Sequence, residues 1–221
     1  MNRNPSIGRP VAGFLFALLL VISFSGCLPL IDRLIYTARG PDTPAAYKGL
    51  AGKRTAIVTI SDSSAFGPDS LTNSISRMVG ARLLAKVRKI DLVPRPIIEN
   101  WIDENGWDGQ DFLSLGEGVK AERVVAIEIS NYGIHEGKTL HKGRANIRML
   151  VYELGGKSGP KLAHSFNLNE YEYPRNGRPA IQSSDRQFEE FFLARVSRLL
   201  TNQFIPHDRF DDFADDAIMA Y

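Results

Sequence analysis

The residue with the most specific chemistry is Cys27, the only cysteine among 221 residues. A lone thiol forms no intramolecular disulfide and completes no metal site by itself. Two small residues, Ser25 and Gly26, precede it, and small side chains let a backbone enter a protease cleft. A thiol is also a nucleophile that can form a thioether with diacylglycerol. Cys27 is therefore a candidate for covalent modification through its sulfur, and a buried free cysteine is the alternative.

The residues before Cys27 have the pattern of a targeting signal. Arg3 and Arg9 precede an uncharged apolar run from Val11 to Phe24, as in a signal peptide. As a helix this run would span about 21 Å, which is less than the roughly 30 Å of a bilayer's hydrocarbon core. A cleaved signal peptide over residues 1–26 is expected, and an uncleaved, tilted membrane anchor is the alternative.

The stretch Phe24–Cys27 resembles the lipobox of bacterial lipoproteins, with Phe24 where leucine or valine is usual. This resemblance implies cleavage before Cys27 and lipidation of its sulfur. Leu28 follows instead of aspartate, which is the inner-membrane retention signal of enteric bacteria. The resemblance therefore implies a lipid-anchored, periplasm-facing protein of the cell envelope, on the outer membrane rather than the inner one.

Removal of residues 1–26 changes the charge balance of the chain. Lysine and arginine together fall from 27 to 25, which equals the number of aspartates and glutamates. A neutral mature chain gives no electrostatic reason to expect binding to nucleic acid. The remaining length predicts one domain that buries a core without disulfides.

Two further motifs suggest a binding site, but their residues lack the spacing or the number that such a site requires. Residues 155–159 read GGKSG, but Val151 stands where a nucleotide-binding loop needs its first glycine. His135 and His141 flank an expected hairpin turn, whereas a zinc site needs three or four ligands in fixed geometry. These histidines are predicted to be exposed hairpin residues, and the sequence predicts no nucleotide, cofactor or metal.

Four carboxylates near the middle of the chain are the best candidates for acid–base catalysis: Asp103, Glu104, Asp108 and Asp111. Two of them could share acid–base work in a cleft. No pair has a spacing that singles it out, and solvated side chains at a helix end explain them more simply. Hydrolysis of a cell-wall or surface polymer is therefore the alternative function.

The elements that position these residues follow from hydrophobic periodicity. The run Thr55–Ile60 indicates a buried strand, and apolar residues at helical spacing indicate a helix from Leu71 to Lys89, with Asp69 or Ser70 as its cap. Arg82, Lys86 and Lys89 form a stripe on that helix, which is either its solvated face or a docking strip for an acidic partner. Next come a short strand in KIDLVP and helices in PIIENWIDENGW and DFLSLGEGVK.

The second half of the sequence changes to a period of two. Three β-rich segments, 122–136, 144–154 and 161–173, are separated by hairpin-like turns. A last helix begins at Ser183, Ser184 or Asp185. The whole predicts an α/β (α+β) domain with a mixed sheet of about five strands, in the order β-α-β-α-β-β-β-α, and helices packed on the sheet.

The chain thus divides into four regions. We expect a signal peptide over residues 1–26, a lipidated N-terminus and tether over 27–53, one α/β domain over 54–205 and an acidic, aromatic tail over 206–221. The tail either packs on the domain or binds a partner and folds on contact.

This order of elements resembles that of three envelope domains: the TolB N-terminal domain, the curli-secretion lipoprotein CsgG and the penicillin-binding-protein activator lipoprotein LpoB. The features that carry the resemblance are FSGC, TAIVTI, the helix from residue 71 to residue 89, KIDLVP with IIENWIDENGW, and ERVVAIEIS. The resemblance implies a non-enzymatic protein that binds an envelope protein from a membrane anchor. The chain lacks the long amphipathic hairpins of a secretion pore, which favours an adaptor or activator.

Overall fold

The five strands of the domain form one mixed sheet. The structure, a computed structural model, describes residues 43–62, 71–155 and 159–208. Within these ranges the strands lie side by side in the order β2-β1-β3-β4-β5. The two pairs that include β1 are parallel, and the pairs β3–β4 and β4–β5 are antiparallel. The strands are β1 (Arg54–Ser61), β2 (Asp91–Leu92), β3 (Arg123–Glu136), β4 (Leu140–Glu153) and β5 (Lys161–Pro179).

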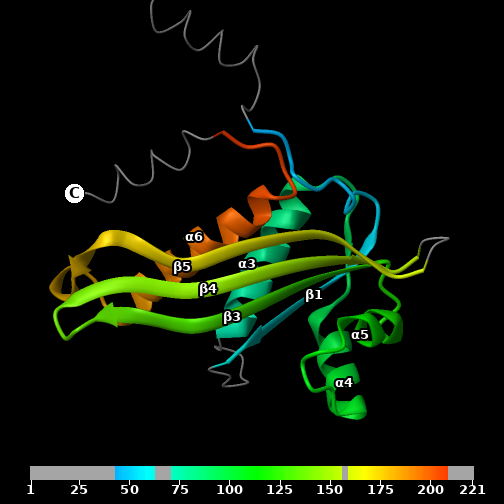
Figure 1. The fold of residues 1–221 in the computed structure, drawn as a ribbon, viewed down its shortest axis with the longest axis horizontal. Coiled ribbons are helices and arrows are strands. Elements are labelled where there is room, and N and C mark those ends of the chain that lie inside the picture. Colours follow the sequence, from blue (N-terminus) through cyan, green and yellow to red (C-terminus); the bar gives the residue numbers. More distant parts are fainter. Residues whose placement is uncertain (1–42, 63–70, 156–158, 209–221) are drawn as a thin grey trace, which may run out of the picture. The chain divides into compact units, whose positions relative to one another are not determined.

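Four α-helices in the described residues cover the sheet (Figure 1). Two of them, α3 (Leu71–Lys86) and α6 (Asp185–Asn202), pack on one face. The other two, α4 (Arg95–Asn105) and α5 (Phe112–Gly118), pack on the opposite face beside β1. The predicted α+β fold class is confirmed. No helix in the described ranges is long and apolar enough to cross a membrane.

Strand β3 contributes side chains to both faces. Val125, Ile127 and Ile129 lie in the core under α3 and α6, while Val124 and Ala126 lie in the core under α4 and α5. This alternation is the geometry of a strand, in which successive side chains point to opposite faces. Because both faces are covered by helices here, the sequence of this strand reads as a continuous apolar run.

Several element ends differ from those expected. The helix α3 ends at Lys86, three residues before the predicted end, and Lys89 has a left-handed backbone with φ of 55°. Strand β2 has only two residues, and β5 runs on to Pro179 instead of ending at Tyr173. The expected caps Asp69 and Ser70 lie outside the described residues.

Residues 43–53 contact the domain, although the sequence predicted a tether as far as residue 53. Thr43 and His207 exchange backbone hydrogen bonds of 3.0 Å, and Leu50 is buried in the core. The hydroxyl of Tyr47 donates to Glu153 Oε1 at 2.8 Å. Burial and this bond to a carboxylate raise the pKa of Tyr47 to about 12.

Candidate functional site at the hairpin end of the sheet

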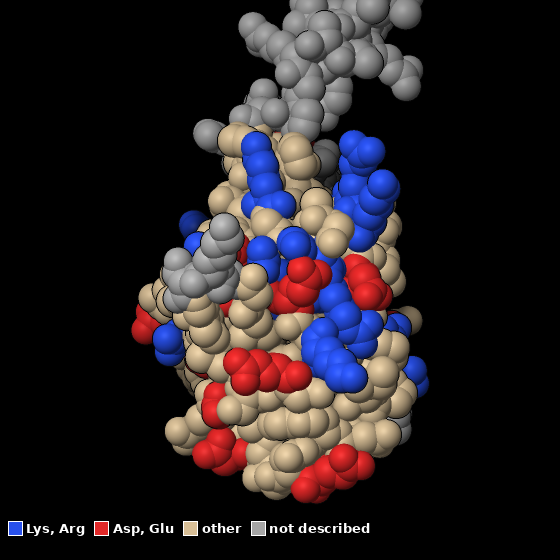
Figure 2. Space-filling model, turned by 90° about the vertical axis from the view of Figure 1, so that its right-hand side faces the viewer, with Lys and Arg blue, Asp and Glu red and all other residues tan. Residues whose placement is uncertain are grey.

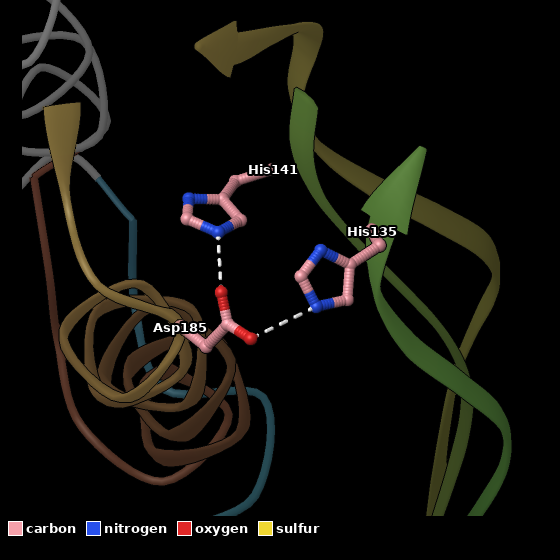
Figure 3. A group of neighbouring side chains, drawn as sticks. All are labelled: His135, His141 and Asp185. Atoms are coloured by element: carbon pink, nitrogen blue, oxygen red, sulfur yellow. Dashed lines mark hydrogen bonds and ion pairs between the residues drawn. The ribbon is translucent and has the colours of Figure 1, made fainter. Parts of the chain in front are cut away.

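The β3–β4 hairpin, the last part of β5 and the start of α6 meet at one end of the sheet (Figure 1). Three side chains converge there (Figure 3): His135, His141 and Asp185, which we call the hairpin cluster. One nitrogen of each histidine and one oxygen of the carboxylate lie within 4.8 Å of one another. Imidazole and carboxylate are both common ligands of divalent metal ions.

The register of the hairpin fixes the two histidines. His135 of β3 pairs with His141 of β4, so their side chains lie on the same face of the sheet. The ring of His141 also stacks on Phe188 of α6, with centroids 4.9 Å apart. Contacts with the rings of His135 and Phe188 therefore hold the imidazole of His141 in place.

A capping box brings the carboxylate to the histidines. Ser184 is the N-cap of α6: its hydroxyl accepts from the backbone N–H of Gln187, and the side chain of Gln187 accepts from the backbone N–H of Ser184. Asp185 follows as the first residue of the helix. A carboxylate in the first turn also interacts favourably with the helix dipole.

Hydrogen bonds join the three side chains. Asp185 Oδ1 lies 2.9 Å from His141 Nε2, and Asp185 Oδ2 lies 3.3 Å from His135 Nε2. The hydrogen bond with His141 and the charge of His135 hold the pKa of Asp185 below its usual value. The other ring nitrogen of His141, Nδ1, is 3.2 Å from the hydroxyl oxygen of Ser183.

The prediction that both histidines are exposed hairpin residues is wrong for His141. Its side chain is fully buried, while those of His135 and Asp185 are 46% and 68% exposed. The spacing of the histidines around a turn was visible in the sequence. The sequence did not show that Asp185 belongs with these histidines, because Asp185 lies 44 residues after His141 and only the packing of α6 brings it to the hairpin.

A pocket of about 1050 Å³ lies at this end of the sheet. Residues 169–179 of β5 form most of its wall, and Gln182, Phe191 and Arg195 complete it. The guanidinium of Arg195 lies 4.9 Å from the ring centroid of Tyr173, which is a cation–π arrangement. Acidic, basic and aromatic side chains thus line one hollow, as in sites that bind polar ligands or peptide segments.

The four candidate carboxylates lie elsewhere. Asp103, Glu104, Asp108 and Asp111 are all solvent-exposed on α4 and before α5, and none of them lines the pocket. Asp111 is the N-cap of α5, where it accepts from the backbone N–H of Ser114 at 3.0 Å. Its hydrogen bonds with Ser114 lower the pKa of its carboxyl, which opposes a role as general acid.

Other candidates from the sequence take ordinary surface positions or lie outside the described residues. Arg82, Lys86 and Lys89 are exposed on and just after α3. Gly155 and Gly159 flank residues 156–158, which are outside the described ranges, as are Cys27 and the tail from residue 209.

The opposite end of the sheet carries a network of charges. Figure 2 shows basic and acidic side chains interleaved on the end where β1 begins and β4 ends, with acidic side chains alone near the lower edge. Lys53 Nζ lies 2.7 Å from Glu122, and Glu153 is paired with both Arg123 and Lys161. Because these charges are paired with one another, this end is not a uniform basic surface.

Comparison with known proteins finds similarity only among solved structures. No protein-family model matches the sequence, and no curated protein matches it. A hypothetical protein from Chlamydia trachomatis is similar, with a TM-score of 0.43 and 15% identity, over 70% of this chain and 98% of that one. A lipoprotein from Neisseria meningitidis has a TM-score of 0.44 and 14% identity, over 66% of this chain and 97% of that one.

The C-terminal domain of LpoB from Salmonella enterica is also similar. Its TM-score is 0.35 and its identity 14%, over 63% of this chain and 91% of that domain. LpoB and a lipoprotein are thus among the similar structures. Similarity at this level assigns neither a family nor a function to the chain.

Proposed function

We propose that this chain is a lipid-anchored, periplasm-facing binding protein of the bacterial cell envelope, which recruits or regulates an envelope machine. The observation that carries the proposal is the sequence Phe24–Cys27 directly after a charged start and an apolar run. A single acyl chain gives a membrane association constant of only about 10⁴ M⁻¹, whereas two or more chains hold a protein lastingly. Lipidated Cys27 would therefore keep the domain at a membrane surface.

The site geometry supports binding rather than catalysis. The pocket beside α6 presents both charge signs and aromatic rings to a protein segment. The four carboxylates of the alternative function, a polymer hydrolase, are exposed, and Asp111 serves as a helix cap. The proposed activity of the domain is therefore binding of an envelope protein.

Metabolic labelling with a palmitate analogue tests the anchor. We expect the wild-type chain to incorporate the label and Cys27→Ser to lose it, because the serine hydroxyl does not form the thioether. As a matched control, Leu28→Asp should keep the label and, in an enteric host, move the protein from the outer to the inner membrane. Labelling that survives Cys27→Ser would overturn the anchor.

Cross-linking in living cells separates binding from hydrolysis. A photo-cross-linking residue at Arg175, in the pocket wall, should capture an envelope protein, whereas the same residue at the distant Glu104 should not. The purified chain should show no turnover of wall polymer. Turnover that is lost when Asp103, Glu104, Asp108 and Asp111 are changed to alanine would replace the proposal with the hydrolase.

A further inference from the structure

The hairpin cluster has the composition and spacing of a metal site. The two contacts that Asp185 makes with the histidines are 2.9 and 3.3 Å. Ligand atoms of a tetrahedral zinc ion lie about 2.1 Å from the metal, and hence about 3.4 Å from one another. The first contact uses Oδ1 of Asp185 and the second uses Oδ2, and one ligand atom from each of the three residues lies within 4.8 Å of the others. The three side chains point toward one another (Figure 3), so small movements would bring them to the separations that an ion imposes.

Ser183 gives the buried histidine the support that metal ligands need. A metal-bound imidazole uses one nitrogen for the ion and donates from its other nitrogen to an oxygen. When Nδ1 of His141 donates to the Ser183 hydroxyl, the lone pair of Nε2 points at the carboxylate of Asp185. Without an ion, Nε2 instead carries the proton and hydrogen-bonds to Asp185 Oδ1 at 2.9 Å, so a bound ion would take the place of that proton.

The three side chains of the hairpin cluster differ in solvent exposure in the way expected for a site that binds an ion. His141 is fully buried and stacked on Phe188, so its ring is held ready before an ion arrives. His135 and Asp185 are partly exposed, so an ion and a coordinating water could reach the cluster from solvent. The nearby Glu136 is paired with Lys142 at 3.3 Å and is not needed as a ligand.

We propose that His135, His141 and Asp185 bind one Zn²⁺ ion, with a fourth position open to water. The ion would join the β3–β4 hairpin to the start of α6. Three protein ligands with a water in the fourth position is the coordination found in zinc enzymes, and in this domain the role proposed for the ion is to hold the hairpin to α6. An ion that binds only the folded state also raises the unfolding temperature.

Titration of the purified full-length chain with ZnCl₂ tests this site. The protein is made without a histidine tag, stripped with EDTA and dialysed, and binding is followed by calorimetry. We expect one Zn²⁺ per chain and at least a tenfold weaker affinity for His135→Ala and Asp185→Asn. His164→Gln changes a histidine of β5 outside the cluster and should bind like wild type. Repeating the titration with Cys27→Ser excludes the thiol as a ligand.

Two readouts keep a folding defect from being mistaken for lost binding. His135 is partly exposed, so His135→Ala should unfold near the wild-type temperature in EDTA, while zinc raises that temperature for wild type only. Co²⁺ in place of zinc should give the intense visible absorption bands of a tetrahedral site, and these should be absent in Asp185→Asn. The absence of bound zinc in wild type, or an unchanged affinity in both cluster variants, overturns the proposal.

Discussion

Gly143 shows how closely the hairpin packs on α6. A side chain at this position would collide with the ring of Phe192. Even a Cβ atom would lie closer to the ring carbons than Cβ atoms lie to other atoms in real proteins. Phe192 is fully buried at the centre of the core between α6 and the sheet. Phe192 stands at helical spacing with Phe188 and Val196, which predicts a core position, but nothing in the sequence shows that a glycine lies opposite it.

We therefore expect Gly143→Ala to destabilise the domain by about 1–3 kcal/mol, the usual cost of overpacking a core. Gly155→Ala is the matched control, since Gly155 has open space around its Cα and no left-handed backbone. The control should be neutral or slightly stabilising. Urea unfolding followed by circular dichroism measures both. Equal midpoints for the two variants would show that Phe192 can move aside without cost.

Helix α6 is the element that connects the core, the pocket and the hairpin cluster. Its start was predicted from the sequence SSDRQ, and the structure selects Ser184 as the N-cap among the three candidates. The same few residues supply Ser183 and Asp185 to His141. A change in the cap should therefore affect both helix stability and the position of the carboxylate.

Removal of the cap tests this element. Ser184→Ala leaves the Gln187 N–H without its partner and should cost about 1 kcal/mol of unfolding free energy. Ser184→Gly should cost only a few tenths of that amount, because glycine is accepted at the N-cap. Thermal or urea unfolding of the three proteins gives the comparison. A glycine variant as unstable as the alanine variant would contradict the capping role of this hydroxyl.

Local patterns in the sequence predicted most elements, and long-range pairing decided the rest. Ile147, Met149 and Val151 stand at every second position of the sequence, which predicts a shared face of a strand, and all three lie in the core with α3 and α6. The last part of β5 contains Pro174 and Pro179, which normally mark turns. These prolines are tolerated because β5 is an edge strand, where half of the N–H groups need no partner strand.

The candidate site was less predictable than the fold. The hairpin that holds His135 and His141 follows from local turn signals, but the burial of His141 depends on Phe188 and Asp185 of a helix far along the chain. The pocket likewise needs β5 and α6 to meet. Sequence periodicity shows that each of these elements has an apolar face, but it does not show which elements pack together.

At the scale of the whole domain, one strand connects two hydrophobic cores. Side chains of β3 alternate between the two cores. Unfolding of the sheet would therefore remove the surface on which both pairs of helices pack. Both tryptophans of the chain, Trp101 and Trp107, pack on the core under α4 and α5. Their fluorescence therefore reports on one layer, whereas far-ultraviolet circular dichroism reports on all helices and strands.

We expect the two signals to give the same urea midpoint, as in a two-state domain. Phe188→Ala tests the coupling, because Phe188 is fully buried in the other core, under α6. Truncation of a buried phenylalanine costs about 3–5 kcal/mol, a large part of the 5–15 kcal/mol of a typical domain. The tryptophan transition should move to lower urea together with the circular dichroism. A tryptophan midpoint that stays in place in this variant would show that α4 and α5 unfold independently of the layer that holds the hairpin cluster.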